Sequence, residues 1–192
     1  MTEHDEHIEG EVIEKEELDP EREARRRLAL AQIRQYPDAA LKMKARPVDE
    51  FDDELRSLVE RMKALMVDAR GIGLAATQVG VLRRVFVFQV DEEHVAAVCN
   101  PEIVERSDET EVADEGCLSI QGVTVPVERS LRVTIEGKDE NGDAVQYELD
   151  DYEARCVQHE ADHLDGVLML DRTTPEARRE ALAVLRPRIV LT

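Results

Sequence analysis

Residues 158–164 read Gln-His-Glu-Ala-Asp-His-Leu and contain the pattern His-Glu-x-x-His. They belong to a segment, from about Tyr152 to Leu164, that predicts a helix. His163 lies about 40° around this helix from His159 and about 6 Å along it, so both imidazoles can bind one ion. Glu160 lies beside the pair, where its carboxylate can reach a metal-bound water without becoming a ligand. The segment therefore predicts a metal-binding helix, and a surface helix with scattered charges is the alternative.

A catalytic divalent ion normally has three protein ligands and one open position, so a third ligand is expected. Glu176 or Glu180, on a predicted later helix, could supply it. Cys117 follows the flexible Gly116 and is another candidate, although a cysteine considered alone is more often a core residue. Cys156 shares the predicted helix, but the ion would lie about 7 Å further along the axis, beyond the roughly 5 Å that a thiolate spans. We therefore assign Cys156 to the core and leave the third ligand open.

The segments around this helix indicate neighbouring strands rather than alternating strands and helices. Val85 to Val90 is rich in β-branched and aromatic residues, and Ala96 to Cys99 is expected to pair with it. Leu131 to Glu136 alternates apolar and polar residues, and Asn141-Gly142 supplies a turn before Val145 to Leu149, which predicts a hairpin. Strands that cluster in this way favour an α+β fold with antiparallel sheet.

Two more helices are predicted. From Phe51 to Arg70 apolar residues recur at the spacing of an amphipathic helix, and Asp49 is a plausible cap before it. Thr174 as a cap and Pro175 in the first turn indicate a helix near the end of the chain. The expected architecture is antiparallel β-sheets packed around a central metal-binding helix, with an N-terminal helix and a short C-terminal helix.

The length of 192 residues and the composition fit one domain with its own core. A total of 25 basic against 44 acidic residues gives a formal net charge of −19, which disfavours binding to DNA or to an anionic membrane surface. No apolar run approaches the roughly 20 residues that cross a bilayer, and Met1 leads into acidic sequence rather than a signal peptide. We expect a cytoplasmic protein. Three cysteines do not suggest a disulfide framework.

The first 24 residues hold eleven acidic residues against Lys15 and Arg22. Few apolar residues are available there to offset the cost of ordering the chain, so residues 1–28 are predicted to be a disordered acidic extension. A solvated tail that aids solubility is the simpler interpretation, and a docking segment for a basic partner is the other. Residues 29–192 are expected to form the folded, catalytic domain.

The sequence Gly71-Ile72-Gly73-Leu74-Ala75-Ala76 formally fits a dinucleotide-binding pattern, which requires a strand before it and a helix after it. Here the predicted order is reversed, so nucleotide binding is disfavoured. What remains is a loop whose open backbone can lie beside an extended peptide, followed by Gln78 with a side-chain amide that can donate hydrogen bonds. A plain helix-to-strand turn is the structural alternative.

Three segments together resemble, in order, the signature motifs of the peptide deformylases. They are Gly71 to Gln78, then Glu115-Gly116-Cys117-Leu118-Ser119, then Gln158 to Leu164. Ile33-Arg34, Pro37-Asp38 and Leu41 also look like the opening of that family, so the resemblance covers about residues 30–172. One departure is Gln121, at a position that is usually proline in the family, which leaves the side-chain preference of the substrate cleft open.

The resemblance implies the function and assigns the site residues. The function would be removal of the formyl group from N-formylmethionyl nascent polypeptides, with release of formate and with the ribosome as a candidate partner. One divalent ion per chain is implied, physiologically Fe²⁺, although the ligand types would also allow Zn²⁺, Ni²⁺ or Co²⁺. By the resemblance, the metal ligands are Cys117, His159 and His163, the general acid and base is Glu160, and the oxyanion donors are Gln78 and the backbone N–H of Leu118. We expect the peptide to pair with backbone near Ile72 and Gly73, and Gly116 is a further candidate substrate-binding residue.

Two other functions fit parts of the sequence. An endopeptidase could use the same His-Glu-x-x-His helix, with Glu176 or Glu180 as the third ligand. A non-catalytic domain could hold a structural ion, but structural zinc sites normally have four protein ligands and the sequence nominates three. The ligand count favours catalysis.

Overall fold

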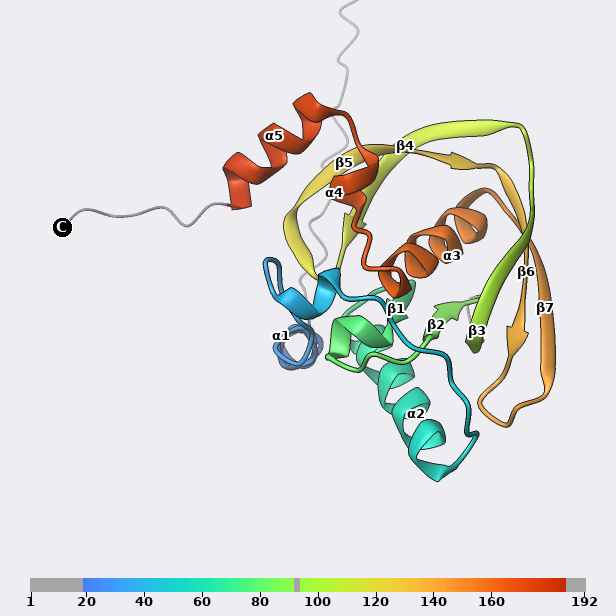
Figure 1. The fold of residues 1–192 in the computed structure, drawn as a ribbon. Helices are drawn as coiled ribbons and strands as arrows, with labels where there is room; N and C mark the ends of the chain where they lie inside the picture. Colours follow the sequence, from blue (N-terminus) through green and yellow to red (C-terminus); the bar gives the residue numbers. More distant parts are fainter. Residues whose placement is uncertain (1–18, 92–93, 186–192) are drawn as a thin grey trace, which may run out of the picture.

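The computed structural model describes residues 19–91 and 94–185. Helix α3 (Asp151–Leu164) lies between two antiparallel sheets, as Figure 1 shows. The larger sheet has the strand order β1-β2-β3-β6-β7, and the smaller consists of β4 and β5. The strands are β1 (Gly73–Ala75), β2 (Val85–Gln89), β3 (Val95–Arg106), β4 (Thr110–Cys117), β5 (Ile120–Ser130), β6 (Arg132–Lys138) and β7 (Ala144–Asp150). The predicted α+β class with a central helix is confirmed.

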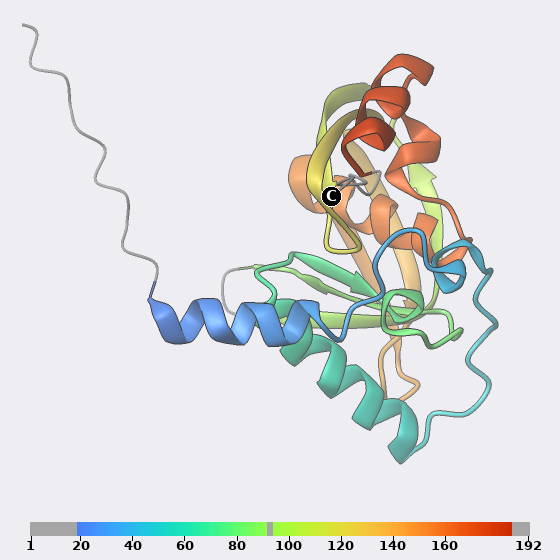
Figure 2. The same ribbon diagram turned by 90° about the vertical axis from the view of Figure 1, so that its left-hand side faces the viewer.

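In the described part of the chain, four other helices and two short 3₁₀ turns pack around the sheets and α3. They are α1 (Pro20–Leu30), α2 (Asp53–Asp68), α4 (Met169–Arg172), α5 (Pro175–Leu185), η1 (Ala39–Lys42) and η2 (Ala76–Val79). Helices α1 and α2 pack together beside β1 and β2, whereas α4 and α5 pack on β5, as Figure 2 shows from a second side. None of the helices in the described ranges combines the length and the apolar character needed to cross a bilayer.

Most residues of helix α3 are buried, because the helix lies between the two sheets. Val157 and Leu164 pack with Phe86 and Phe88 of the larger sheet, and Cys156 joins the same cluster. The predicted assignment of Cys156 to the core is therefore confirmed. Polar residues of the same helix are also buried, and they are Gln158, His159, Glu160, Asp162 and His163. Burial of so many polar side chains requires partners. Gln158, His159 and Asp162 have them, whereas the Glu160 Oε2 and the His163 Nδ1 have no hydrogen-bond partner among the described residues.

Helix α2 confirms the amphipathic pattern but begins after a different cap. The side chain of Asp52, not Asp49, accepts a hydrogen bond from the Leu55 N–H at 2.9 Å. Both aspartates fit the cap preference, and the observed one lies where its oxygen reaches the N3 amide of the first turn. The helix ends at Asp68, and Arg70 then takes a left-handed conformation with φ 59°. This turn sends the chain into the glycine-rich segment that leads to β1.

Helix α1 corrects the prediction that residues 1–28 form a disordered extension, because residues 20–28 are helical. The carboxylate of Asp19 caps the helix by accepting from the Glu21 N–H at 3.0 Å. Acidic residues in the first turn and Arg27 in the last complement the helix dipole. Ala29 and Leu30 end the helix in a core cluster with residues of α2. The residues before 19 in the expected extension lie outside the described part of the chain.

The strand predictions are confirmed in part. β2 pairs with β3 from Val85↔Cys99 to Gln89↔Val95, and β6 and β7 form the expected hairpin. β3 continues beyond Cys99 because Asn100 (φ 50°) and Pro101 lie in an irregularity of its pairing with β6, where a missing proline N–H is tolerated. The Thr174 hydroxyl accepts from the Ala177 N–H at 3.2 Å, which confirms the cap of α5.

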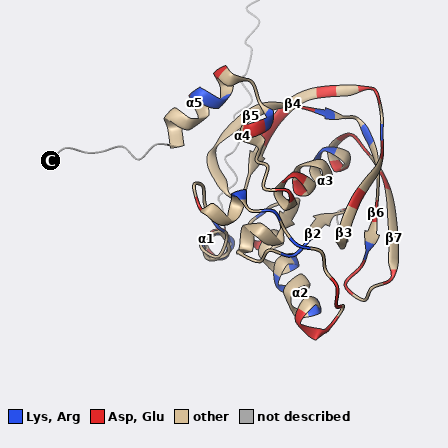
Figure 3. Ribbon diagram, in the orientation of Figure 1, with Lys and Arg blue, Asp and Glu red and all other residues tan. Residues whose placement is uncertain are grey.

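The β4–β5 ribbon was not expected from the sequence. Its strands carry many polar residues and include Pro126, which pairs opposite Asp114. Figure 3 shows acidic residues on this ribbon, on β3 and on the first turn of α2. The ribbon nevertheless buries Val125 and Val127 in a cluster with α4 and α5.

Candidate metal and active site

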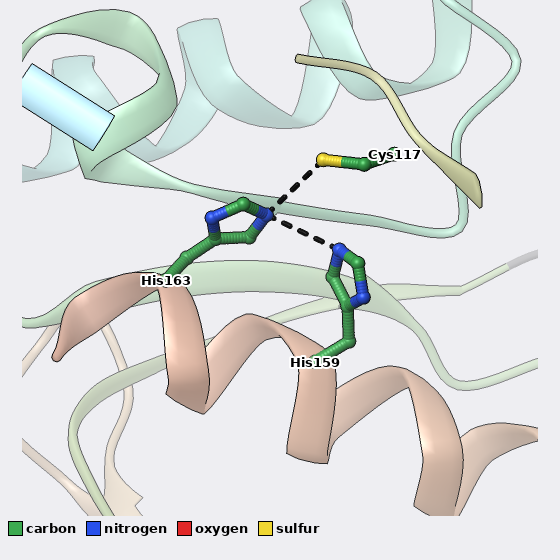
Figure 4. Close-up of side chains that lie close together, drawn as sticks. All are labelled: Cys117, His159 and His163. Atoms are coloured by element: carbon green, nitrogen blue, oxygen red, sulfur yellow. Dashed lines mark hydrogen bonds between the residues drawn. The ribbon is translucent and has the colours of Figure 1, made fainter. Parts of the chain in front are cut away.

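Two histidines of α3 and one cysteine of β4 lie close together, as Figure 4 shows. The Nε2 atoms of His159 and His163 are 3.1 Å apart, and the Cys117 Sγ lies 3.3 Å from the Nε2 of His163. The three candidate ligand atoms all lie within 4.8 Å of one another. One sulfur and two imidazole nitrogens in this arrangement fit zinc or another first-row divalent ion.

Cys117 reaches this point because β4 ends there and turns back into β5. The pairing of the two strands shifts between Glu115 and Cys117, which displaces the end of β4 from regular register. The Cys117 Sγ accepts a hydrogen bond from the Ser119 N–H at 3.4 Å and another from the Gln78 Nε2 at 3.5 Å. These bonds orient the sulfur toward the histidines.

Glu176 and Glu180, the other candidates for the third ligand, do not lie with the histidines. Both are exposed on α5, which packs on β5. Within the described residues, the group that could hold an ion with the two histidines contains Cys117 and neither glutamate. The structure therefore brings together the ligand set implied by the deformylase resemblance.

Glu115 orients His159 from the side opposite the candidate ion. Its Oε2 accepts from the Nδ1 of His159 at 3.0 Å, which leaves the Nε2 atom facing Cys117 and His163. Burial would raise the pKa of Glu115, but hydrogen bonds from His159 and Arg129 outweigh it and hold this pKa at about 2. A carboxylate bonded to the outer nitrogen of a ligating histidine is a common support of metal sites.

A buried network of ion pairs holds Glu115 in turn. Arg129 of β5 donates to Glu115 at 2.8 and 3.0 Å and to Asp162 of α3 at 2.6 Å. Arg155 donates to Glu115 at 3.0 Å and also to the Val127 carbonyl. Arg172 of α4 donates to Asp162. These residues carry no predicted role. The only signal was the position of Glu115 and Asp162 inside the two motifs.

The carboxylate of Glu160 lies beside the two histidines. It is buried, and its Oε2 has no hydrogen-bond partner among the described residues. Burial, assisted by the charge of Glu115, raises the pKa of Glu160 to about 7 although His159 acts to lower it. A carboxyl group with a pKa near neutrality can both accept and donate a proton. Gly73 passes so close that a Cβ at this position would collide with the Glu160 carboxylate.

Gln78 is fixed in η2 at the other side of Cys117. Its Oε1 accepts from the Ala75 N–H at 2.8 Å, and its Nε2 donates to the Ser119 hydroxyl at 3.1 Å. These contacts aim the amide nitrogen toward the sulfur and the cleft. The predicted site residue Gln78 therefore lies within reach of the candidate ion.

A cleft of about 420 Å³ opens onto these groups. Its lining includes the four remaining residues nominated from the sequence, Ile72, Gly73, Gly116 and Leu118, together with Glu160. Apolar residues on several elements contribute to the walls, and they are Leu30, Ile72, Leu118, Ile120, Val123 and Cys156. The cleft has the size and the apolar lining of a site for a small peptide segment.

Comparison with known proteins relates this arrangement to a family. The family model described as polypeptide deformylase matches residues 30–179. The chain belongs to the polypeptide deformylase family. It is therefore an enzyme of the peptide deformylase type, as the motifs predicted.

Individual deformylases are similar over most of their length. The peptide deformylase of Acidothermus cellulolyticus is 46% identical over 159 residues, which cover 83% of this chain and 87% of that protein. The crystal structure of the peptide deformylase from Thermotoga maritima has a TM-score of 0.71 at 47% identity and covers 74% of this chain and 97% of that one. The deformylase from Synechococcus elongatus, in complex with actinonin, has a TM-score of 0.76 at 39% identity, covering 80% and 86%.

Proposed function

We propose that this chain is a metal-dependent deformylase that removes the formyl group from the N-terminal formylmethionine of newly made polypeptides and releases formate. The observation that carries the proposal is the convergence of Cys117, His159 and His163 beside the open carboxylate of Glu160. The deformylase family supplies the class of substrate. Residues 29–192 are the proposed catalytic domain.

Cys117, His159 and His163 would hold the ion. Three protein ligands leave a position for water or substrate, which is typical of catalytic rather than structural sites. A divalent ion bound there would supply Lewis acidity, which lowers the pKa of a water molecule and polarises a carbonyl oxygen. Iron(II) is the ion that we propose, and zinc, nickel and cobalt fit the same donors. Metal analysis of protein purified without oxygen tests this choice.

Glu160 is the proposed general base and then the general acid. Its carboxylate accepts a proton from the attacking water, the oxygen of which forms a bond to the formyl carbon. The same proton then passes from Glu160 to the amine nitrogen as the bond between that nitrogen and the formyl carbon breaks. Formate and a free methionine amine result. The raised pKa of Glu160, about 7, suits both transfers.

Gln78 and the backbone N–H of Leu118 are the proposed donors to the formyl oxygen as negative charge develops on it. Loss of one such donor commonly lowers the rate by about 10² to 10³. Gln78 is suited to this role because its carbonyl is held by the Ala75 N–H, which fixes the direction of its amide group. Leu118 follows the candidate ligand directly in the turn between β4 and β5.

The peptide is proposed to lie along the glycine-rich segment before β1. Ile72, Gly73 and Gly116 border the cleft and expose backbone at which an extended chain can pair. The methionine side chain would enter the apolar part of the cleft near Ile72 and Leu118. Gln121 also lines the cleft, where the family usually has proline, and is expected to affect substrate preference.

A formate-release assay separates this proposal from its rivals. The metal-loaded chain should release formate from a formylated methionyl peptide and leave casein intact. Cleavage of casein without release of formate would favour an endopeptidase, and neither reaction with a bound ion would favour a structural site. We propose that the enzyme works in the cytoplasm, where nascent polypeptides emerge from the ribosome.

A further inference from the structure

Helix α1 lies largely outside the residues that match the family, which begin at residue 30. It nevertheless forms part of the cleft, because Arg26 and Leu30 belong to the lining. Figures 1 and 2 both show α1 near the turn that joins β4 and β5, and residues of that turn line the same cleft. The cleft lining of this chain therefore includes a residue, Arg26, that lies before the part matched by the family model.

Two arginines belong to this part of the lining. Arg26 of α1 and Arg70, directly before the glycine-rich segment, both line the cleft. They share one counter-ion, Glu23, at 3.7 Å from Arg26 and 3.8 Å from Arg70. Within residues 19–91 and 94–185, two guanidinium groups against this one carboxylate leave one positive charge in excess. The side chains of Arg26 and Arg70 are 35% and 37% exposed, so substrate can reach them.

Among the described residues, neither guanidinium group donates a close hydrogen bond. Both distances to Glu23 exceed the usual hydrogen-bond range, and no side-chain hydrogen bond from either guanidinium is found within the described residues. A guanidinium presents a planar set of N–H donors that matches a carboxylate, often through two parallel bonds. The pair is thus suited to a second carboxylate that enters the cleft.

The other charged residues that line the cleft are paired, lie at the reaction centre or are acidic. Arg155 is held by Glu115 and by two backbone carbonyls, those of Val127 and Glu111. Glu115 is neutralised by its arginines, and Glu160 lies at the reaction centre. Asp114 is an exposed residue of β4 that also lines the cleft. The wall formed by α1 and Arg70 is therefore the basic side of the cleft.

We propose that Arg26 and Arg70 bind an acidic side chain of the substrate peptide, close after the formylmethionine, and so make this enzyme prefer acidic nascent N-termini. The inference rests on the proposed deformylase function and deepens it. Because the contact is remote from the bond that breaks, it should act mainly on KM. An exposed ion pair of this kind corresponds to about a two- to fivefold preference.

The test compares formyl-Met peptides that carry glutamate or the isosteric glutamine at the second, third or fourth residue. All peptides have amidated C-termini, so the only carboxylate is the side chain under test. Formate release by the full-length, metal-loaded chain gives kcat and KM for each. Variants Arg26→Gln and Arg70→Gln are compared with Arg25→Gln, which makes the same charge change on α1 at an exposed residue outside the cleft lining.

We expect a preference for glutamate of about two- to fivefold in kcat/KM at one position, expressed in KM and reduced by salt. Arg26→Gln and Arg70→Gln should reduce the ratio between the two peptides toward one, whereas Arg25→Gln should keep it. Equal rates for glutamate and glutamine at every position would overturn the inference alone, as would equal effects of all three variants. Absence of formate release from the glutamine peptides would instead contradict the proposed function, and the inference with it.

Discussion

At the scale of single residues, Glu160 carries the proposed proton transfers without binding the ion. The variant Glu160→Ala should therefore retain the metal and lose activity by a factor of about 10² to 10⁴. Metal content and formate release measured on the same sample check both parts. Glu153→Ala, on the first turn of the same helix, is the matched control and should keep both. Substantial turnover by Glu160→Ala would refute the role of this carboxylate.

Gly73 is required because the Glu160 carboxylate occupies the place that a Cβ would take. We expect Gly73→Ala to lower the free energy of unfolding by about 1 to 3 kcal/mol, as overpacking does. In a Glu160→Ala background the cost should be smaller, because the colliding carboxylate is gone. Denaturant unfolding of the two single variants and the double variant measures this coupling. Strict additivity would show that the two side chains do not meet.

Glu115 should set the affinity of the site for its ion through His159. Glu115→Gln removes the charged acceptor of the His159 Nδ1–H and is expected to weaken metal binding by about 10- to 100-fold. Competition with a chelator measures the affinity, and circular dichroism verifies that the variant is folded. Asp114→Asn makes the same charge change one residue earlier on an exposed side chain and should bind metal as the parent does. Equal affinities for the two variants would remove the proposed influence of Glu115.

Most of the candidate site residues could be predicted from the sequence. The partners of Glu115 could not, and the reason is physical. The i, i+4 spacing of His159 and His163 implies convergence on one helix face, and the motif around Cys117 supplied the third candidate. The partners of Glu115 could not be read in the same way. Arg129 and Arg155 are brought to it by the folding of β5 and α3, and nothing in their spacing along the chain indicates that contact.

At the scale of elements, Arg129 ties β5 to β4 and α3 through Glu115 and Asp162. Arg129→Met should destabilise the fold by about 3 to 5 kcal/mol, because it leaves two buried carboxylates without their central partner. Arg132→Met removes an exposed pair with Glu109 and should cost about 0 to 1 kcal/mol. Urea unfolding of both variants gives the comparison. A small effect of Arg129→Met would mean that the network contributes little to stability.

The elements that were not predicted, or were predicted too short, have weak or interrupted sequence patterns. α1 is highly charged, and its end alone packs in the core, so its apolar content did not indicate a helix. β4 lacks a regular alternation of buried and exposed residues, and β5 contains Gly122 and Pro126. In β3, the predicted strand stopped at Cys99, whereas the observed strand continues past a local irregularity to Arg106. The hairpin of β6 and β7 was predictable because its pattern and turn agree.

At the scale of the whole molecule, the candidate ligands join separate parts of the fold. Cys117 comes from the two-stranded sheet, and both histidines come from the helix between the sheets. The larger sheet packs against one side of this helix. Gly73 of β1 lacks a side chain and so leaves room for the Glu160 carboxylate. The candidate ligands meet only when these layers are assembled, so we expect binding of an ion there to be coupled to folding of the domain.

The most direct measurement is metal content and formate release, determined together, for the parent chain and for Cys117→Ala. The parent is expected to hold one divalent ion per chain and to release formate from a formyl-Met peptide. Cys117→Ala should lose both, whereas Cys99→Ala, at a buried cysteine of β3 outside the site, should lose neither. A Cys117→Ala protein that still holds one ion and releases formate at the parent rate would contradict the account.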